Sequence, residues 1–525
     1  MNPPTPVPSP PLLRGERVGV RGDSKPAAFE NSAQATGISA EIDALLNVEW
    51  LRYGYCGVVV RDLQTGETLY KRDSERMLIP ASNMKLLVTA AALHRLGPEY
   101  RFRTRVWMRG TLLPDGTLRG DLILQGLGDA TLEMRGLETL AQQVRQAGVK
   151  RVQGYLLYDD SWLDAERYGF GWSSDDEPFG YQAQMSALCA ERNAVRLYAK
   201  PAAQVGEPAQ LRLEPATDYV ELVNRTRTVE RGAANTGIRA TRTRARNQII
   251  VDGTLPLGSE EVFVGRYSVE NPSRYAAHLF RQALQAAGVV VERGIVPALT
   301  PSIPHSRPAG EGERAGEPPF APTPLSHTVG EGLGVRADKS NHLTLLAEHL
   351  SPPMREVVAL INKPSDNLIT EITLKTLGKE VRGEGTTAAG VQVLREFLQS
   401  AGLEMGAVHV VDGSGLSRIN GVSPENFVRL LEYMHRSPHA EAFRDSLPVY
   451  GVDGTLRNRL RGTPVQGNGY AKTGSLNRVS SLSGYLRTKS GRWLAFSIIM
   501  NAYNASGADA RALQDKLVQI LWERL

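Results

Sequence analysis

Three short strings in this chain hold residue types that together can acylate a serine. They are Ser82-Asn83-Met84-Lys85, Ser365-Asp366-Asn367 and Lys472-Thr473-Gly474, in that order. Each string alone is common by chance, but the ordered set is uncommon, and each member stands in the local setting that its chemistry requires. The set predicts a serine nucleophile with a lysine base and further polar groups around it.

The first string lies at the start of a predicted helix. Apolar residues recur at helical spacing over 79–96, and Gly97-Pro98 supplies a stop signal. Ser82 and Lys85 therefore share one helix face, and the positive end of the helix dipole favours negative charge near Ser82. A desolvated lysine can lose its proton, so Lys85 is the candidate base. Taken alone, the string is better explained by an N-cap serine followed by a solvated lysine.

The other two strings have their own expected settings. Lys472 would lie on a strand and present a fixed cation to a substrate carboxylate, and Gly474 would let a substrate backbone approach that strand closely. Ser365 and Asn367 lie where a loop enters a helix, so Ser365 could relay a proton and Asn367 could hold a substrate amide. The alternatives are an ordinary edge strand with a surface lysine, and a plain helix start.

The elements that must position these residues come from both ends of the chain. Residues 469–503 have the pattern of three strands, broken at Ser475-Leu476-Asn477 and at a turn over 489–492, and a helix follows from about Gly507. A two-strand hairpin over 53–73 precedes Ser82. We therefore expect one five-stranded antiparallel sheet that combines the two ends.

At this point the chain resembles the penicilloyl-serine transferases. The long separation between Ser82 and Ser365 is typical of the D-alanyl-D-alanine carboxypeptidase/endopeptidase group of the penicillin-binding protein 4 type, the class C low-molecular-mass penicillin-binding proteins. Five further segments look like that group: QGLGDATL (125–132), YDDSWLD (158–164), GW with an acidic pair (171–176), DGSGLSR (412–418) and GVDGTLRNRL (451–460). The resemblance covers roughly residues 40–525.

The resemblance implies an α+β fold with nested insertions, which the length of 525 residues and the apolar content of 41% can support. A β-lactamase-like catalytic domain, with helices flanking the five-stranded antiparallel sheet, would be interrupted by a second domain, itself interrupted by a third. The expected boundaries are 1–40, a disordered N-terminal segment; 41–99 and 328–525, the catalytic domain; 100–199 and 271–300, inserted domain II; 200–270, the β-rich inserted domain III; and 301–327, a disordered loop rich in Pro, Gly and charge.

The resemblance also implies roles for the residues that match the group's motifs. Ser82 would be the nucleophile, Lys85 its base, and Ser365 and Asn367 groups on a second wall of the site. The terminal carboxylate of the substrate would bind Lys472 and Thr473. The backbone N–H groups of Ser82 and Ser475 would form the oxyanion hole.

Five more residues fall where this group builds a pocket for the far end of a diaminopimelate side chain. They are Asp176, Tyr181, Arg418, Leu476 and Asn477. Asp176 would pair with the ammonium of that zwitterionic group and Arg418 with its carboxylate. Asp176 is preferred over Asp175 on its spacing after Trp172 alone, and a solvated acidic turn is the alternative for both.

Taken with these residues, the resemblance implies a serine D,D-peptidase that acts on peptidoglycan stem peptides through an acyl-Ser82 intermediate. It would cleave D-Ala-D-Ala termini, D-Ala-diaminopimelate cross-links, or both, and β-lactam antibiotics would inhibit it covalently. Two alternatives stay open, namely a β-lactamase or esterase that uses the same serine, and a non-catalytic cell-wall-binding protein. No GxSxG string occurs, which argues against an α/β-hydrolase.

Charge and cysteine content add few other expectations. The net charge is +5, and its clearest local excess is seven arginines over 225–247. We interpret this run as alternating Thr and Arg on the outer face of a strand rather than as a binding site for an anionic polymer. No aromatic residue is interleaved with the arginines to support nucleic-acid binding. Cys56 and Cys189 are predicted to be two buried thiols rather than a disulfide. No HExxH or CxxC string occurs, so we expect no metal and no cofactor.

The N-terminal residues 1–34 are rich in Pro and Arg and hold no apolar core of a signal peptide. No transmembrane segment is expected either. The proposed substrate nevertheless lies outside the cytoplasm, so we expect a periplasmic or extracellular protein and interpret this start as atypical or misassigned. No oligomeric state is predicted.

Overall fold

The computed structural model describes residues 37–298 and 343–525. The predicted loop 301–327 and the first thirty-six residues of the predicted segment 1–40 lie outside the described residues. Residues 37–40 are not irregular, because helix α1 spans Gly37–Leu46 and buries Ile42 and Leu46 against the C-terminal part of the chain.

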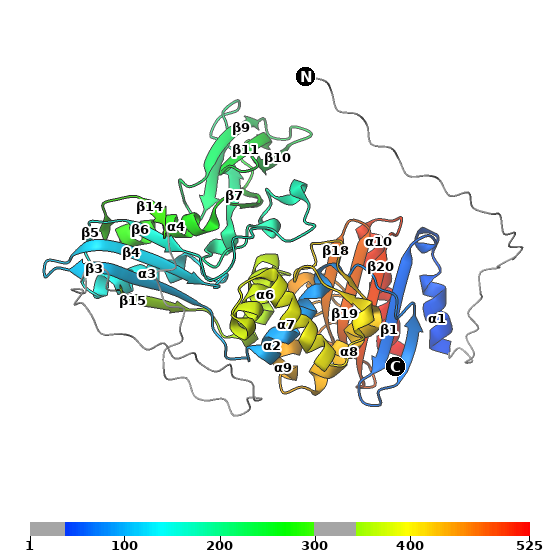
Figure 1. The fold of residues 1–525 in the computed structure, drawn as a ribbon. Helices are drawn as coiled ribbons and strands as arrows, with labels where there is room; N and C mark the ends of the chain where they lie inside the picture. The colour runs from blue at the N-terminus through cyan, green and yellow to red at the C-terminus, as the bar shows by residue number, and fades with distance from the viewer. Residues whose placement is uncertain (1–36, 299–342) are drawn as a thin grey trace, which may run out of the picture.

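A five-stranded antiparallel sheet joins the two ends of the chain, as the sequence predicts. Its strand order is β18-β19-β20-β1-β2. Strand β1, from the N-terminal part of the chain, pairs with β20, from the C-terminal part, and Val59 lies opposite Ser497. Figure 1 shows the blue N-terminal strands beside the red and orange C-terminal ones. The strands are β1 (Tyr55–Asp62), β2 (Thr68–Arg72), β18 (Gly469–Leu476), β19 (Val479–Arg487) and β20 (Trp493–Asn501).

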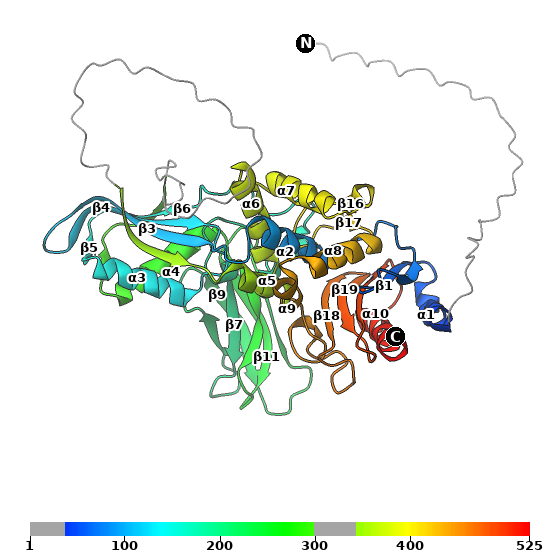
Figure 2. The same ribbon diagram turned by 90° about the horizontal axis from the view of Figure 1, so that it is seen from below.

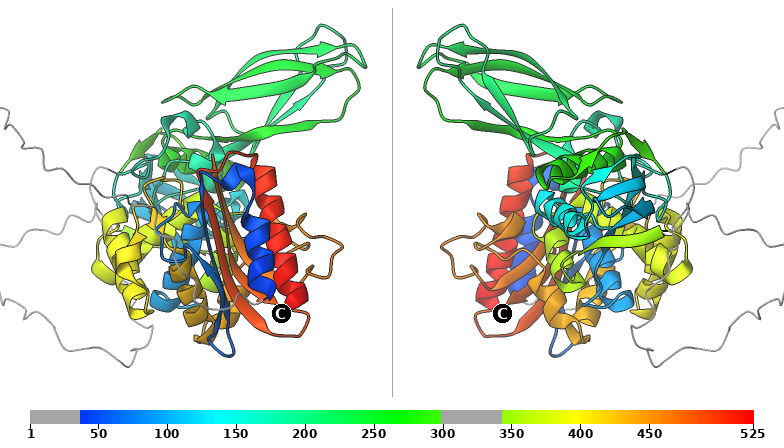
Figure 3. Two further views of the ribbon diagram at one scale, coloured as in Figure 1. Left: turned by 90° about the vertical axis from the view of Figure 1, so that its right-hand side faces the viewer. Right: turned by 90° about the vertical axis from the view of Figure 1, so that its left-hand side faces the viewer.

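Helices cover both faces of this sheet, which is why its central strands are buried on both sides. Val58 and Val60 point into the core shared with α1 and α10 (Gly507–Arg524), whereas Val59 points into the core on the opposite face. Figure 3 shows α1 and α10 side by side on one face. The opposite core is formed with α2 (Met84–Arg95), α5 (Met354–Asn362), α6 (Asn367–Arg382), α7 (Thr387–Ser400), α8 (Pro424–Arg436) and α9 (Ala440–Asp445).

A second, seven-stranded sheet follows α2 in the chain. In Figures 1 and 2 the helical layer around α2 and α6 lies between this sheet and the five-stranded one. The sheet has the path β13-β5-β4-β3-β15, with β6 paired to β4 and β14. Its members are β3 (Arg103–Leu112), β4 (Thr117–Leu127), β5 (Arg151–Val152), β6 (Leu156–Asp159), β13 (Val290–Val291), β14 (Ile295–Pro297) and β15 (Leu343–Leu350), packed with α3 (Met134–Gln146) and α4 (Pro272–Ala286).

Strand β15 departs from the expected boundary at residue 328. The sequence placed 328–525 wholly in the catalytic domain, but β15 hydrogen-bonds to β3 along its length, with Ala347 opposite Val106. Both of these side chains are buried in the core of the seven-stranded sheet. Burial of that apolar pair explains why the returning chain adds a strand here before it enters α5.

The innermost part of the chain is β-rich and projects away from the rest (Figures 1 and 3). On β9, Arg225 and Arg227 are exposed while Thr226 and Thr228 are buried, which is the alternation that the sequence predicts. Arg242 is an exception to the expected surface run, because its side chain is fully buried. The strands are β7 (Ala194–Lys200), β8 (Gln210–Glu214), β9 (Glu221–Val229), β10 (Gly237–Arg242), β11 (Gln248–Pro256) and β12 (Val262–Ser268).

Candidate active site

Ser82 lies in a single 3-10 turn, Ala81–Asn83, which leads directly into α2. Lys85 occupies the first turn of that helix, and its Nζ atom donates a hydrogen bond of 3.0 Å to Ser82 Oγ. The first string therefore forms the predicted serine–lysine pair, and Lys85 is fully buried rather than solvated.

Lys85 has two other partners, and both are acceptors. Its Nζ atom donates to Asn367 Oδ1 and to the backbone oxygen of Ser414, each at 2.6 Å. A neutral amine has two N–H bonds and one lone pair. When Lys85 loses the proton directed at Ser82, the two other acceptors engage both remaining N–H bonds and the lone pair faces the Ser82 hydroxyl. Burial lowers the pKa of Lys85 to about 8, which makes the neutral amine accessible near physiological pH.

The second and third strings meet on the opposite wall of the site. Lys472, on β18, donates from Nζ to Ser365 Oγ at 2.9 Å and to its neighbour's oxygen, Thr473 O, at 2.8 Å. Ser365 takes a positive φ of 64° just before α6, and Asp366 caps that helix by accepting from Ile369 N at 2.9 Å. Burial, with repulsion from Lys85, lowers the pKa of Lys472 well below its usual value.

Gly474 is required by the close packing of β18 on the nucleophile turn. A Cβ atom at this position would lie 2.9 Å from Ser82 N, 2.7 Å from Pro80 O and 2.2 Å from Ser481 Oγ. The strand thus brings the exposed Ser475 next to the turn that holds Ser82. Thr473 Oγ1 donates to Thr455 Oγ1 at 2.7 Å.

Two of the predicted rim residues lie beside the string residues. The backbone oxygen of Tyr181 accepts from Asn367 Nδ2 at 2.7 Å, and Tyr181 Oη donates to Asp176 Oδ1 at 2.6 Å. Asp175 turns away and pairs with Arg244 at 2.7 Å. The sequence predicts that Asn367 holds a substrate amide, whereas here both ends of its side chain bond to Lys85 and to Tyr181.

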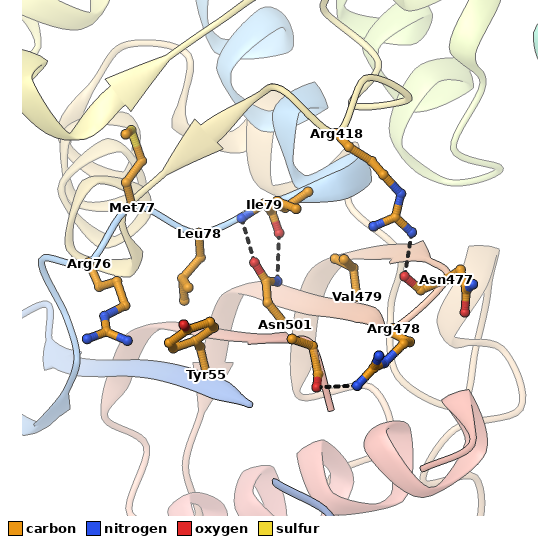
Figure 4. A pocket seen from close by; sticks show the side chains of 11 residues that line it. Tyr55, Arg76, Met77, Leu78, Ile79, Arg418, Asn477, Arg478, Val479 and Asn501 are labelled. Atoms are coloured by element: carbon orange, nitrogen blue, oxygen red, sulfur yellow. Dashed lines mark hydrogen bonds between the residues drawn. The ribbon is translucent and has the colours of Figure 1, made fainter. Parts of the chain in front are cut away.

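The remaining rim residues gather where β18 ends. Leu476 is the last residue of that strand, and Asn477 follows it in the turn to β19. Arg418 reaches across from a separate loop and donates to the backbone oxygen of Asn477 (Figure 4). The contacts thus join Asp176 with Tyr181, and Arg418 with Asn477, as two groups at the edge of the site.

Sequence reasoning missed Glu371 as a residue of this site. Its buried carboxylate accepts from Gly413 N and, at 2.7 Å, from Ser414 N, and so positions Ser414, the residue whose backbone oxygen accepts from Lys85. Burial and the nearby Asp412 raise the pKa of Glu371 to about 7. A usable signal was present, because Glu371 is four residues after Asn367 and therefore lies on the same face of α6.

Asp412, in the segment 412–418, organises the loop that carries both Ser414 and Arg418. Its carboxylate accepts from Gly415 N at 2.9 Å, from Ser417 N at 2.7 Å and from Trp172 Nε1 at 2.9 Å. Within the described ranges, no group of His, Cys, Asp or Glu side chains is arranged to hold a metal ion.

The fold and the meeting of the three strings beside α2 define the class of penicillin-binding proteins. The chain belongs to the D-Ala-D-Ala carboxypeptidase 3 (S13) family, whose sequence profile matches residues 38–307 and 328–524. The resemblance to the penicillin-binding protein 4 group is thereby confirmed.

Three comparisons give the extent of that similarity. The chain is 36% identical over 546 residues to a D-alanyl-D-alanine carboxypeptidase of Actinomadura sp. (strain R39), covering 98% of this chain and 94% of the relative. It is 23% identical to D-alanyl-D-alanine carboxypeptidase DacB of Haemophilus influenzae, over 88% of each chain. The crystal structure of penicillin binding protein 4 from Haemophilus influenzae matches with a TM-score of 0.72 at 23% identity, covering 92% of this chain and 98% of that one, which confirms the predicted fold class.

Proposed function

We propose that this D-Ala-D-Ala carboxypeptidase family member is a serine D,D-peptidase whose nucleophile is Ser82 and whose base is Lys85. The observation that carries the proposal is the set of three contacts made by Lys85 Nζ. Two partners, Asn367 Oδ1 and Ser414 O, accept only, so the neutral amine directs its lone pair to the third partner, Ser82 Oγ. A lysine on the protein surface would instead form its hydrogen bonds with water, whereas Lys85 is fully buried.

The acylation step follows from these positions. Lys85 takes the Ser82 proton as Oγ attacks the carbonyl carbon of the penultimate D-alanine, and the oxyanion accepts hydrogen bonds from the backbone N–H groups of Ser82 and Ser475. When the C–N bond breaks, Ser365 passes its proton to the departing amine and receives in turn the proton that Lys85 took from Ser82. Lys472 Nζ, which donates to Ser365 Oγ at 2.9 Å, orients that hydroxyl for the relay. Water then attacks the acyl-Ser82 ester and releases the shortened peptide.

The rim residues extend the proposal to the leaving group and the donor side chain. Lys472 and Thr473 bind the terminal carboxylate. Asp176 and Arg418 recognise the ammonium and the carboxylate of a diaminopimelate group, with Tyr181 holding Asp176 in place at 2.6 Å. An amine on either a free D-alanine or a cross-linked diaminopimelate can then leave, so the same site performs carboxypeptidase and endopeptidase cleavage.

Two properties follow from the substrate class. β-Lactams present a strained amide to the same serine and inhibit the protein as a stable acyl-enzyme. Peptidoglycan lies outside the cytoplasm, so the protein works in the periplasm or at the cell exterior. No helix among the described residues has the length and apolar character needed to cross a bilayer.

The test is covalent labelling with a fluorescent penicillin, read by intact mass. It compares the wild type, Ser82→Ala and, as a matched control, Ser490→Ala in the exposed turn between β19 and β20. We expect one adduct that persists for many minutes in the wild type and the control and is absent in Ser82→Ala. Release of D-alanine from diacetyl-L-Lys-D-Ala-D-Ala should follow the same pattern. Rapid drug hydrolysis without an adduct would instead indicate a β-lactamase. The absence of both an adduct and drug hydrolysis would overturn the catalytic proposal.

A further inference from the structure

A pocket of about 770 Å³ opens beyond the end of β18, outside the serine–lysine site. Its walls come from the start of β1, the segment that leads to Ser82, and the turn between β18 and β19 (Figure 4). It meets the candidate site through Arg418 and Asn477, which belong to both. The proposed reaction assigns no role to the other lining residues.

The pocket is cationic and lacks a compensating acid. Arg76, Arg418 and Arg478 line it, and no Asp or Glu is among its eleven lining residues. Arg418 and Arg478 donate to backbone oxygens, which carry no net charge. Arg76 is exposed, stacks on Tyr55 at 4.7 Å and forms no ion pair with any described residue. Three guanidinium groups around one hollow favour an anion, and a carboxylate fits their planar donors.

The floor of the pocket is fixed before any ligand arrives. Asn501 Oδ1 accepts from Ile79 N at 2.7 Å, and Asn501 Nδ2 donates to Ile79 O at 3.1 Å (Figure 4). Arg478, with a φ of 57°, is held by Ala502 O at 2.8 Å and by Tyr503 O at 3.0 Å. A preformed hollow with oriented donors binds a ligand at little cost in ordering.

The direction of β18 relates the pocket to the substrate. In the proposed function the terminal carboxylate lies at Lys472 and Thr473, and the reacting carbonyl lies beside Ser475. The donor peptide upstream of that carbonyl therefore continues toward Asn477. A strand advances about 3.3 Å per residue, so Asn477 lies roughly 10 Å beyond Gly474, within reach of the second or third residue upstream.

We infer that this pocket binds a carboxylate on the donor peptide, upstream of the residue that is joined to D-Ala-D-Ala. The inference rests on the proposed function, because that function sets the direction in which the donor lies. It deepens the proposal by making the stem peptide, beyond its last two residues, part of what the protein recognises.

The test uses two pentapeptides that differ at one group. L-Ala-γ-D-Glu-L-Lys-D-Ala-D-Ala carries the upstream carboxylate, and its γ-D-isoglutamine counterpart carries a carboxamide. We expect the wild type to cleave the carboxylate peptide with a kcat/KM about three- to tenfold higher. Arg76→Gln should abolish most of that preference, and raised ionic strength should reduce it.

Arg52→Gln is the matched control. It removes the same charge from a similar stack of Arg52 on Tyr53, 5.4 Å away, that does not line the pocket. It should keep the preference. Equal cleavage of both peptides by the wild type, or an unchanged preference in Arg76→Gln, would overturn the inference. Failure of the proposed function looks different, since the wild type would then cleave neither pentapeptide nor diacetyl-L-Lys-D-Ala-D-Ala.

Discussion

Tyr181 and Asn367 connect the inserted region to the serine–lysine pair through one side chain. Asn367 Nδ2 donates to Tyr181 O at 2.7 Å, while its Oδ1 accepts from Lys85 at 2.6 Å. An amide with both ends engaged has only one orientation that satisfies both partners. The segment that carries Tyr181 therefore fixes which end of Asn367 faces the base, so the insertion contributes to the reacting groups as well as to the rim.

The rate of Ser82 acylation should depend on the protonation of Lys85. Its pKa is lowered to about 8, and the base works only when it has lost its proton. Below that pH, the second-order rate of penicillin acylation should therefore rise about tenfold per pH unit, and it should level off above it. Stopped-flow labelling from about pH 6 to pH 10 measures this. A rate that stays constant across the whole range would contradict the role of Lys85.

Gly474→Ala should impair acylation while leaving the protein folded. The new Cβ would meet Ser82 N and Pro80 O at less than 3.0 Å, so the nucleophile turn must shift. A displacement of about 1 Å can reduce turnover about a hundredfold. Gly237→Ala, on strand β10 with no atom within 4 Å of the new Cβ, is the control and should acylate normally. Normal acylation by Gly474→Ala would show that the turn tolerates the shift.

Arg242→Ala should lower the free energy of unfolding by about 3 kcal/mol, because it removes one partner of a buried ion pair. Arg242 is fully buried and donates to Glu177 at 2.9 Å and to Glu270 at 2.8 Å. Arg244→Ala, two residues further on, removes only the exposed pair with Asp175 and should change stability by about 0.5 kcal/mol or less. Urea unfolding followed by circular dichroism measures both. Equal losses of unfolding free energy in the two variants would contradict the expected effect of burial on the strength of these ion pairs.

Both cysteines should resist alkylation in the folded protein. Cys56 and Cys189 are free and buried, as the sequence predicts, and burial raises the pKa of each thiol to about 12. The reactive thiolate is therefore scarce as well as inaccessible. Iodoacetamide at pH 8 should add no mass to the native protein and two adducts after unfolding. Rapid modification of the native protein would indicate local opening at one of these strands or loops.

Sequence patterns predicted the local elements and the five-stranded sheet well, because β-strand runs and turn residues report short-range geometry. They could not predict that Arg242 is buried, since its acidic partners Glu177 and Glu270 come from distant segments. The pairing of β15 with β3 could not be predicted either, because a residue pattern that indicates a strand does not identify the strand with which it pairs. The roles of the string residues remain predictions that the contacts support.

The pairing of β1 with β20 also determines when, during synthesis of the chain, the five-stranded sheet can form. Ser82 and Lys85 are synthesised early, but β1 cannot complete its sheet until β20 has been made, and contacts between such distant segments form slowly. A chain that stops before residue 493 would carry the serine and the lysine without the strand that joins β19 to β1. Reaction with a β-lactam would then report that the chain has been synthesised through β20, in addition to reporting the presence of a nucleophile.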